Sequence, residues 1–240
     1  MDREDIVYHM AGIDEYTLSE HRLKIVVGET GRELICTRSD LRELVYGYLI
    51  SEGIIASAEE VISIYLKDDE SVASVSVSEI PAGDSKEAGS TPFFVPFDPD
   101  MISDMSACFL ASGTLHNKTS ATHLAALAKD GEFLCVFEDI SRHCAIDKAI
   151  GYGACAGIDM SNAMLFTSGR VQEDTVRKLL NSGIPVLISK ATATKQAIDL
   201  ARENNMTLIG RARGDSPLAC YNCTVPTDLD QDQNSRPLSD

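Results

Sequence analysis

The sequence predicts an α/β protein in which a smaller α+β region precedes a larger α/β domain. From residue 124 onward, apolar stretches of strand length alternate with helical stretches, a pattern typical of parallel sheets with right-handed crossovers. The first half instead holds paired strands around one helix, and a segment rich in Pro and Gly separates the two halves. We therefore expect residues 1–97 to form the α+β region with a linker, residues 98–227 the α/β domain, and residues 228–240 a disordered tail.

The composition is that of an ordinary globular protein, with 44% hydrophobic and 24% charged residues. The net charge of −16 argues against a nucleic-acid partner, because such a partner requires a basic face. A nucleotide in a local basic pocket remains compatible with this charge. No apolar run reaches membrane-spanning length, and the acidic N-terminus lacks an apolar signal segment. We expect a cytoplasmic protein without membrane contact.

Two strands and a helix are predicted near the N-terminus. Residues 23–27 and 33–37 have the composition of strands, joined by a Gly-containing hairpin turn. Ser39 is the predicted cap of a helix whose apolar residues recur on one face, and Gly53 is its predicted end. Residues 1–20 are weakly patterned, so we expect an arm or an edge strand there.

The middle of the chain changes from strands to a segment without periodic pattern. Residues 61–66 and 72–77 are predicted strands, and the second alternates Val with Ser. Pro and Gly interrupt residues 79–99 repeatedly, so this segment is the best candidate for a linker. A helix is predicted from residue 100 to residue 111.

The second half contains the alternating strands and helices. Its expected elements are strands at 124–128, 132–137, 163–167, 185–189 and 207–210, with helices after the second, third and fourth of them. Each strand is bordered by a polar turn. Parallel strands bring such turns to one edge of the sheet, where α/β proteins bind ligands.

The most informative stretch is the strand–turn–helix segment from Phe137 to Gly151. Its turn holds Glu, Asp, Ser, Arg, His and Cys, and Ala and Ile then repeat at helical spacing. Ser141 can cap the helix, so part of this polarity can be structural. A cap alone does not require the other ionisable residues of the segment. These are Arg142, His143, Asp147 and Lys148. We expect Asp147 to orient one of the two preceding cations rather than to act as a base.

Cations recur in the polar turns of the second half. Together with Gly and Ser after successive strands they favour an anion site, to which helix N-termini would add amide donors. Scattered surface cations are the alternative explanation for any single residue. No Walker or Gly-x-Gly-x-x-Gly sequence is present, which argues against ATP hydrolysis and dinucleotide redox chemistry. Besides Arg142 and His143, the candidate ligand-binding residues are His123, Ser168, Arg170, Lys190, Arg211, Ala212, Arg213, Gly214, Asp215 and Ser216.

Seven cysteines in a chain of 240 residues do not indicate a disulfide scaffold. Four have apolar surroundings that predict burial, namely Cys36, Cys108, Cys135 and Cys155. Cys144 follows Arg142 and His143 at a helix N-terminus, which should lower its pKa. Cys220 and Cys223 form a Cys-x-x-Cys that three hypotheses explain: a thiol relay, half of a zinc site, or two cysteines packed in a terminal strand.

The strand–turn–helix segment also resembles a known family. Its pattern Glu-Asp-x-x-Arg-His-x-Ala-x-Asp-Lys-x-x-Gly is similar to the signature of the formate dehydrogenase accessory sulfurtransferases, the FdhD/NarQ family. Ser-Glu-Gly-Ile-Ile at residues 51–55 is similar to the family's N-terminal region. The resemblance covers about residues 23–221. It implies a three-layer, cytidine-deaminase-like fold for the larger domain.

The resemblance further implies sulfur transfer during formate dehydrogenase maturation. In the family, a cysteine takes a persulfide from a cysteine desulfurase and passes the sulfur to the metal cofactor. That cargo is the molybdenum (or tungsten) bis(molybdopterin guanine dinucleotide) cofactor, whose guanine nucleotide contacts the loop that residues 211–216 match. Arg211 here replaces a typically aromatic residue. The expected partners are a cysteine desulfurase, the formate dehydrogenase catalytic subunit and a second copy of the chain.

The sequence departs from the family at its thiols. The family's Cys-x-x-Cys loop precedes the helix that starts here near residue 100, and residues 79–92 contain no cysteine. The family's Thr-Gly-x-x-His is altered to Thr-Ser-Ala-Thr-His at residues 119–123. A sulfurtransferase with Cys220 and Cys223 as relocated carrier, and Cys144 as second candidate, therefore competes with a cofactor-binding chaperone that has lost the thiol. A deaminase-type zinc hydrolase is a third hypothesis, which the missing His-x-Glu disfavours.

Overall fold

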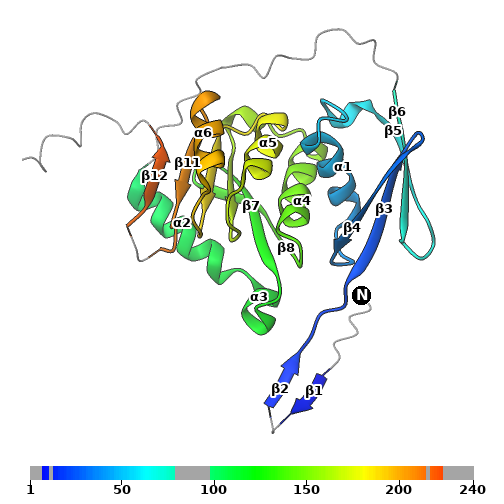
Figure 1. Ribbon diagram of the computed structural model, residues 1–240, viewed down its shortest axis with the longest axis horizontal. Coiled ribbons are helices and arrows are strands. Elements are labelled where there is room, and N and C mark those ends of the chain that lie inside the picture. Colours follow the sequence, from blue (N-terminus) through cyan, green and yellow to red (C-terminus); the bar gives the residue numbers. More distant parts are fainter. Residues whose placement is uncertain (1–6, 11–12, 79–97, 215–216, 224–240) are drawn as a thin grey trace, which may run out of the picture.

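The computed structural model describes residues 7–10, 13–78, 98–214 and 217–223 (Figure 1). Most of the predicted linker and the whole predicted tail lie outside these residues. Three sheets are formed: a two-stranded ribbon, a four-stranded sheet and a six-stranded sheet. None of the described helices is long and apolar enough to cross a membrane.

The four-stranded sheet forms from the N-terminal region in the order β4-β3-β6-β5. Its strands are β3 (His21–Val27), β4 (Thr30–Cys36), β5 (Val61–Leu66) and β6 (Val72–Val77). β3 pairs antiparallel with β4, as the predicted hairpin requires, and parallel with β6. β4 is therefore an edge strand. The separate ribbon consists of β1 (Val7–Met10) and β2 (Ile13–Tyr16).

The six-stranded sheet has the order β12-β11-β10-β9-β7-β8. Its strands are β7 (His123–Lys129), β8 (Glu132–Asp139), β9 (Met164–Thr167), β10 (Val186–Ser189), β11 (Thr207–Gly210) and β12 (Ala219–Asn222). The three strands β9, β10 and β11 are parallel, as predicted. β7 and β12 run antiparallel to their neighbours, so the sheet is mixed.

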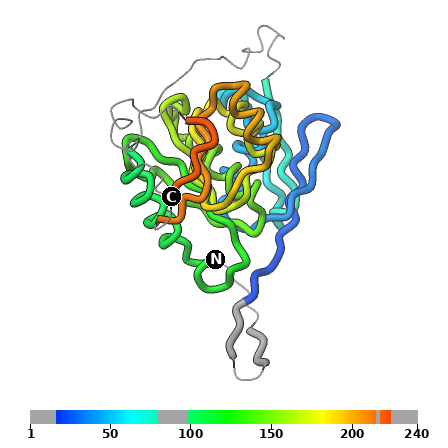
Figure 2. The backbone as a smooth tube through the Cα atoms, turned by 60° about the vertical axis from the view of Figure 1, so that its left-hand side comes forward, coloured from blue at the N-terminus to red at the C-terminus, as the bar shows by residue number. Residues whose placement is uncertain are grey.

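Helices cover both faces of the six-stranded sheet (Figures 1 and 2). One face packs against α4 (Arg142–Cys155), α5 (Glu173–Asn181) and α6 (Lys195–Glu203), and the other against α2 (Pro99–Ala111). Of the remaining helices, α1 (Leu41–Ser51) lies beside α4, and α3 (Thr114–Thr119) precedes β7. The short 3₁₀ turns are η1 (Ala58–Glu60) and η2 (Met160–Asn162). The α/β prediction is confirmed in this form, and the cytidine-deaminase-like assignment stays a prediction.

Helix ends follow the sequence in most places. Ser141 accepts a hydrogen bond from the Cys144 amide and caps α4, as predicted, and Gly53, with φ of 70°, follows the end of α1. The predicted cap at Ser39 is wrong, because Asp40 holds the N-cap position without a side-chain bond. The Ser39 hydroxyl instead lies 3.4 Å from that of Thr37.

Two glycines let α1 pack directly on α4. A Cβ on Gly47 would overlap the backbone of Asp147, and a Cβ on Gly151 would overlap the backbone of Glu43. The N-terminal region is thereby joined to the large sheet, since one hydrophobic cluster contains Leu23 of β3 together with residues of α1, α4 and β9. This contact places the end of β4 next to the polar turn that precedes α4.

Candidate functional site

Most of the predicted ligand-binding residues lie along one edge of the six-stranded sheet. β8 runs in the same direction as β9, β10 and β11, because both β8 and β9 are antiparallel to β7. The turns after these four strands therefore share an edge with the start of β7, as predicted. They carry Arg142 and His143, Ser168 and Arg170, Lys190, and Arg211 to Gly214, and His123 begins β7. Asp215 and Ser216 lie outside the described residues.

Hydrogen bonds join these turns to one another. The Lys190 amide donates to the Thr167 carbonyl oxygen (3.0 Å), and the Ser189 hydroxyl donates to the Gly169 carbonyl oxygen (2.7 Å). Arg213 Nε reaches the Lys190 carbonyl oxygen at 3.4 Å. The edge is therefore a connected surface rather than a set of independent loops.

The backbone amides of these turns have partners inside the protein. Donors with internal acceptors are the amides of Ser168, Gly169, Lys190, Ala191, Arg211 and Ala212. The Ser168 hydroxyl accepts from the Leu124 amide at 2.9 Å. These six amides are therefore not available to an anion, whereas the expected contribution of the helix N-termini that follow the turns stays a prediction.

Four cations of this edge are available to a ligand. Among the described residues, Arg170, Lys190, Arg211 and Arg213 have no ion-pair partner, and the three arginines are exposed. Arg142 instead donates to the Gln172 side-chain oxygen. The neighbouring Ala212 is buried and contributes no surface.

Burial controls the protonation of the two histidines near this edge. Burial, assisted by the charge of Arg142, lowers the pKa of His123. Burial also lowers the pKa of His143, although Asp174, 3.5 Å from its Nε2, acts in the opposite direction. Both imidazoles are therefore held neutral at pH 7.

Glu138, near the end of β8, caps the helix α3. Its carboxylate accepts the amides of Thr114 (2.6 Å), Leu115 (3.0 Å) and His116 (2.7 Å) at the start of α3. Burial raises the pKa of Glu138, but these amides and nearby hydroxyls outweigh it, so the pKa is lowered. Sequence patterns did not predict α3, because its cap, Glu138, is 24 residues away from Thr114 in the sequence.

Asp139 and Lys148 form a buried ion pair. Lys148 Nζ lies 2.7 Å from Asp139 Oδ2, and neither side chain is exposed. Lys148 also donates to the Thr37 hydroxyl at 2.8 Å, while Asp139 accepts from the amides of Thr37 (3.1 Å) and Ser141 (2.9 Å). This pair ties the end of β4 to the signature turn.

Asp147 pairs with Lys178 of α5 rather than with Arg142 or His143. Lys178 Nζ lies 3.0 and 3.1 Å from the two carboxylate oxygens, and Ser51 donates to Asp147 at 2.7 Å. Burial raises the pKa of Asp147. The expected orienting role of Asp147 is therefore wrong. Neither Asp147 nor Lys148 reaches a ligand at the sheet edge, because both side chains are buried.

Cys144 is not an activated thiol. It is 2% exposed, and its Sγ faces the Ile35 carbonyl oxygen at 3.6 Å. Burial, followed by the charge of Asp139, raises the pKa of Cys144 to about 12. The expected low pKa is wrong, because desolvation of a buried thiolate exceeds the effect of a helix N-terminus.

The other predictions of cysteine burial divide evenly. Cys36 is buried and Cys135 is partly buried, with pKa values raised by burial to about 12 and about 11. Cys108 and Cys155 are exposed, so their predicted burial is wrong. Cys108 lies on the solvent-facing side of α2, and Cys155 is the last residue of α4.

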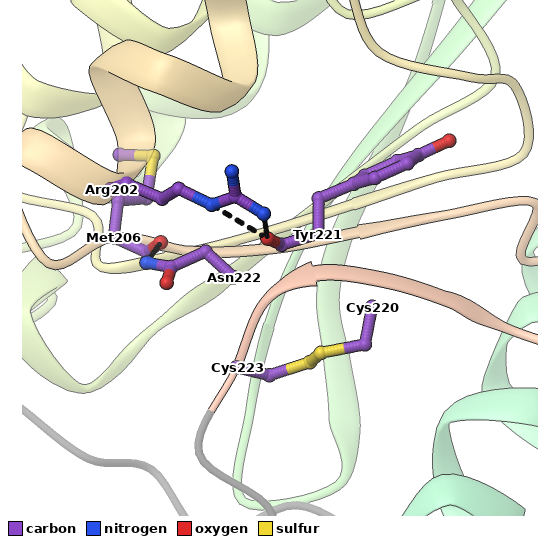
Figure 3. The surroundings of a disulfide bond; sticks show 6 residues. All are labelled: Arg202, Met206, Cys220, Tyr221, Asn222 and Cys223. Carbon is purple, nitrogen blue, oxygen red and sulfur yellow. Dashed lines mark hydrogen bonds between the residues drawn. A yellow bond between two sulfur atoms is a disulfide. The ribbon is translucent and has the colours of Figure 1, made fainter.

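Cys220 and Cys223 lie at the terminal strand β12 and are joined as a disulfide (Figure 3). Their Cα atoms are 5.9 Å apart. Cys220 is exposed and Cys223 partly buried. Tyr221 between them holds the strand, because its carbonyl oxygen accepts from Arg202 of α6. The described residues contain no group of three or more His, Cys, Asp and Glu side chains that could hold a metal ion.

The lining of a cavity of about 730 Å³ includes neither the available cations of the sheet edge nor the cysteine pair. The cavity forms between β4, α1, α4 and α5, and its lining includes Ile35, Tyr48, Glu52, His143 and Lys178. Sequence patterns did not reveal it, because its four walls come from segments far apart in the chain.

Comparison with known proteins gives consistent matches. A model of the FdhD/NarQ family matches residues 18–92 and 83–224. Sulfur carrier protein FdhD of Methanothermobacter thermautotrophicus is 32% identical over 189 residues, which cover 72% of this chain and 76% of that protein. Sulfur carrier protein FdhD of Geobacillus kaustophilus is 30% identical over 233 residues, with 84% and 86% covered.

A solved structure supports the fold. It is described as a formate dehydrogenase accessory protein from Desulfotalea psychrophila, and it superposes with a TM-score of 0.75. The match covers 92% of this chain and 96% of that chain at 24% identity.

The Glu138 contacts predict a specific acid sensitivity. Because the folded-state pKa lies below the ordinary value of 4.5, this carboxylate stabilises the fold above pH 4.5, and the contribution is lost as pH falls through the folded pKa. We expect Glu138→Gln to lower the free energy of unfolding by about 1–2 kcal/mol at pH 6 and by less at pH 3.5, measured by urea unfolding. Glu59→Gln, at an exposed carboxylate, is the control. Equal losses at both pH values for Glu138→Gln would contradict the assignment.

Proposed function

Because the chain belongs to the FdhD/NarQ family, we propose that it is an accessory protein of formate dehydrogenase maturation that carries sulfur on Cys220 and Cys223. The names of its relatives, sulfur carrier protein FdhD and formate dehydrogenase accessory protein, support the general role. The assignment to these two cysteines rests on the exposure of Cys220 and on the proximity of Cys223 to it.

The cysteine pair and the cationic loop lie on the same face of the sheet. Cys220 is the cross-strand partner of Ile209, which packs toward α2. The loop after β11 also rests on α2, since the Ser103 hydroxyl donates to the Gly214 carbonyl oxygen at 2.9 Å. Cys36, Cys135 and Cys144 are less suitable carriers, because burial raises the pKa of each thiol.

Loading of sulfur is a thiol–persulfide exchange. The Cys220 thiolate attacks the outer sulfur of a persulfide on a donor cysteine. The donor's sulfur–sulfur bond breaks, the donor thiolate leaves, and Cys220 becomes a persulfide. Cys220 is the better attacking residue of the two, since it is exposed whereas Cys223 is partly buried.

Delivery uses the second thiol. The Cys223 thiolate attacks the inner sulfur of the Cys220 persulfide, which forms the Cys220–Cys223 disulfide and releases HS⁻ toward the cofactor metal. The dithiol supplies the two electrons that reduce the transferred sulfur to sulfide. A cellular dithiol reductant must then reduce the disulfide before the next cycle.

The substrate of delivery is a molybdenum or tungsten bis(guanine dinucleotide) cofactor held along the sheet edge. Its phosphates require cations, and Arg170, Lys190 and Arg211 offer them in a protein of net charge −16. Arg213, whose Nε contacts the Lys190 carbonyl, contributes a fourth cation. Side-chain guanidinium groups suit phosphate oxygens because of their fork of donors.

A second candidate function is that of a cofactor-binding chaperone without sulfur transfer. One observation favours it: residues 79–92, which correspond to the family's thiol loop, contain no cysteine. In that case the sheet edge keeps its role and Cys220 and Cys223 only stabilise β12.

Persulfide mapping distinguishes the two functions. The reduced protein is incubated with a cysteine desulfurase and cysteine, and persulfides are located by mass spectrometry. We expect the modification on Cys220, and at least a tenfold loss of total persulfide in Cys220→Ser. The control is Cys108→Ser/Cys155→Ser, which removes the other two exposed thiols and should leave loading unchanged. Persulfide on none of the cysteines would contradict sulfur carriage and leave the chaperone function.

Calorimetry with GDP tests the cargo site separately. We expect GDP to bind, and Arg213→Ala to weaken it by about tenfold to a hundredfold, because a charge-assisted phosphate contact contributes about 1.5–3 kcal/mol. Arg177→Ala on the exposed side of α5 removes an equal charge away from the edge and should change affinity by less than about twofold. Absence of binding heat, or equal effects of the two variants, would contradict the site.

A further inference from the structure

The cavity between β4 and the helices α1, α4 and α5 takes no part in the proposed function. Its volume of about 730 Å³ exceeds that of a single buried side chain. The residues that form it include neither the cysteine pair nor the unpaired cations Arg170, Lys190 and Arg211. Residues 32–35 of β4 form one of its walls.

β4 presents backbone groups along this cavity that no neighbouring strand pairs with in the part of the chain that the structure describes. It is an edge strand of its sheet, with β3 on one side only. The Ile35 carbonyl oxygen points away from β3, because it faces the Cys144 thiol at 3.6 Å. Backbone groups of an antiparallel strand alternate in direction, so those of Glu33 and Gly31 point the same way. Among the described residues no other strand pairs with this edge.

The cavity lining is acidic. Five carboxylates line it against two permanent cations. One of the carboxylates, Glu33, is paired with Arg22 of β3 at 2.8 Å, but the balance stays negative, so an incoming positive charge is favoured. The carboxylates are those of Glu20, Glu33, Glu52, Asp147 and Asp174, and the cations are Arg32 and Lys178.

The cation deepest in the cavity is already engaged. Lys178 Nζ contacts Ser51 Oγ (2.9 Å), Glu52 Oε1 (2.7 Å) and both oxygens of Asp147. Burial lowers the pKa of His143, so this residue adds no positive charge at neutral pH. Glu20 and Asp174 at the rim therefore have no strong cationic partner among the described residues.

Apolar groups complete the lining. Leu34, Ile35, Tyr48 and Ile140 contribute to the wall, and Ile35 is 40% exposed. A Lys or Arg side chain fits such a surface, because its methylene stem packs on apolar groups while its charged end meets carboxylates.

We propose that β4 accepts an extended segment of a partner protein as an additional strand, with a Lys or Arg side chain of that segment in the acidic cavity. Strand addition provides affinity through the backbone groups of Gly31, Glu33 and Ile35, and the cavity provides specificity for a basic side chain. A second copy of this chain is a poorer occupant, because pairing of two β4 strands would bring two acidic cavities together. The proposal does not depend on the sulfur carrier.

The probe is a fluorescein-labelled heptapeptide of alternating Thr and Val with Lys at its centre. Fluorescence anisotropy with the full-length protein should detect binding that weakens as salt rises. Replacing the central Lys by Glu should weaken binding at least about tenfold. Hydrogen exchange should slow at the amides of Gly31, Glu33 and Ile35 when the Lys peptide binds, because these amides become strand-paired.

Two variants test the two parts of the site. Glu20→Lys/Asp174→Lys reverses the charge at the rim of the cavity and should lower the affinity for the Lys peptide at least about tenfold. Asp104→Lys/Glu203→Lys makes the same charge change at exposed residues of α2 and α6 and should alter affinity less than about twofold. Glu33→Pro removes a backbone amide that points away from β3 and makes no bond to it, a change that edge strands tolerate. This variant should abolish peptide binding, while its thermal unfolding should stay cooperative.

Several results would overturn the proposal. These are no peptide binding at about 1 mM, equal affinity for the Lys and Glu peptides, equal effects of the two double variants, or unchanged exchange at the three amides. Light scattering measures the oligomeric state and so tests whether a second copy of this chain occupies β4. A dimer that Glu33→Pro converts to monomer would show that a second copy, not a basic segment, occupies β4.

Discussion

Two buried ion pairs on adjacent residues of α4 determine how the two halves of this protein fit together. Asp147 reaches Lys178 of α5 and Ser51 of α1, while Lys148 reaches Asp139 of β8 and Thr37 after β4. Because neighbouring helix residues project in different directions, the two pairs hold different sides of α4. Each charge is costly to bury alone, so the arrangement is stable only when every partner is in place. The close contact of α1 with α4 at Gly47 and Gly151 depends on the same geometry.

This constraint separates structural from chemical roles in the signature segment. Glu138, Asp139, Asp147 and Lys148 are used within the fold, as a helix cap and as ion-pair members. The side chains left for a ligand come instead from the turns after β9, β10 and β11. The molecule therefore has two regions: a cationic sheet edge with a nearby cysteine pair, and an acidic cavity between β4, α1, α4 and α5.

Sequence patterns predicted what depends on local chemistry. The β3–β4 hairpin, the Ser141 cap and the turn positions of the parallel strands follow from short-range periodicity and turn residues, and the structure has them. Partners distant in sequence could not be predicted. Lys178 is 31 residues from Asp147, and no pattern links them. The prediction of a low pKa for Cys144 was wrong for a related reason. The neighbouring cations in the sequence favoured a low pKa, whereas burial in the folded protein raises it.

A double-mutant cycle on Asp139 and Lys148 tests most directly whether buried pairing holds the signature helix in place. Lys148→Met should lower the free energy of unfolding by about 3–5 kcal/mol, because it leaves a buried carboxylate unpaired, and adding Asp139→Asn should recover about 2 kcal/mol or more. The exposed pair Glu173–Arg177 of α5 is the control, with an expected coupling of about 0.5 kcal/mol. Recovery in the double variant would support the account, whereas additive losses from Lys148→Met and Asp139→Asn would contradict it.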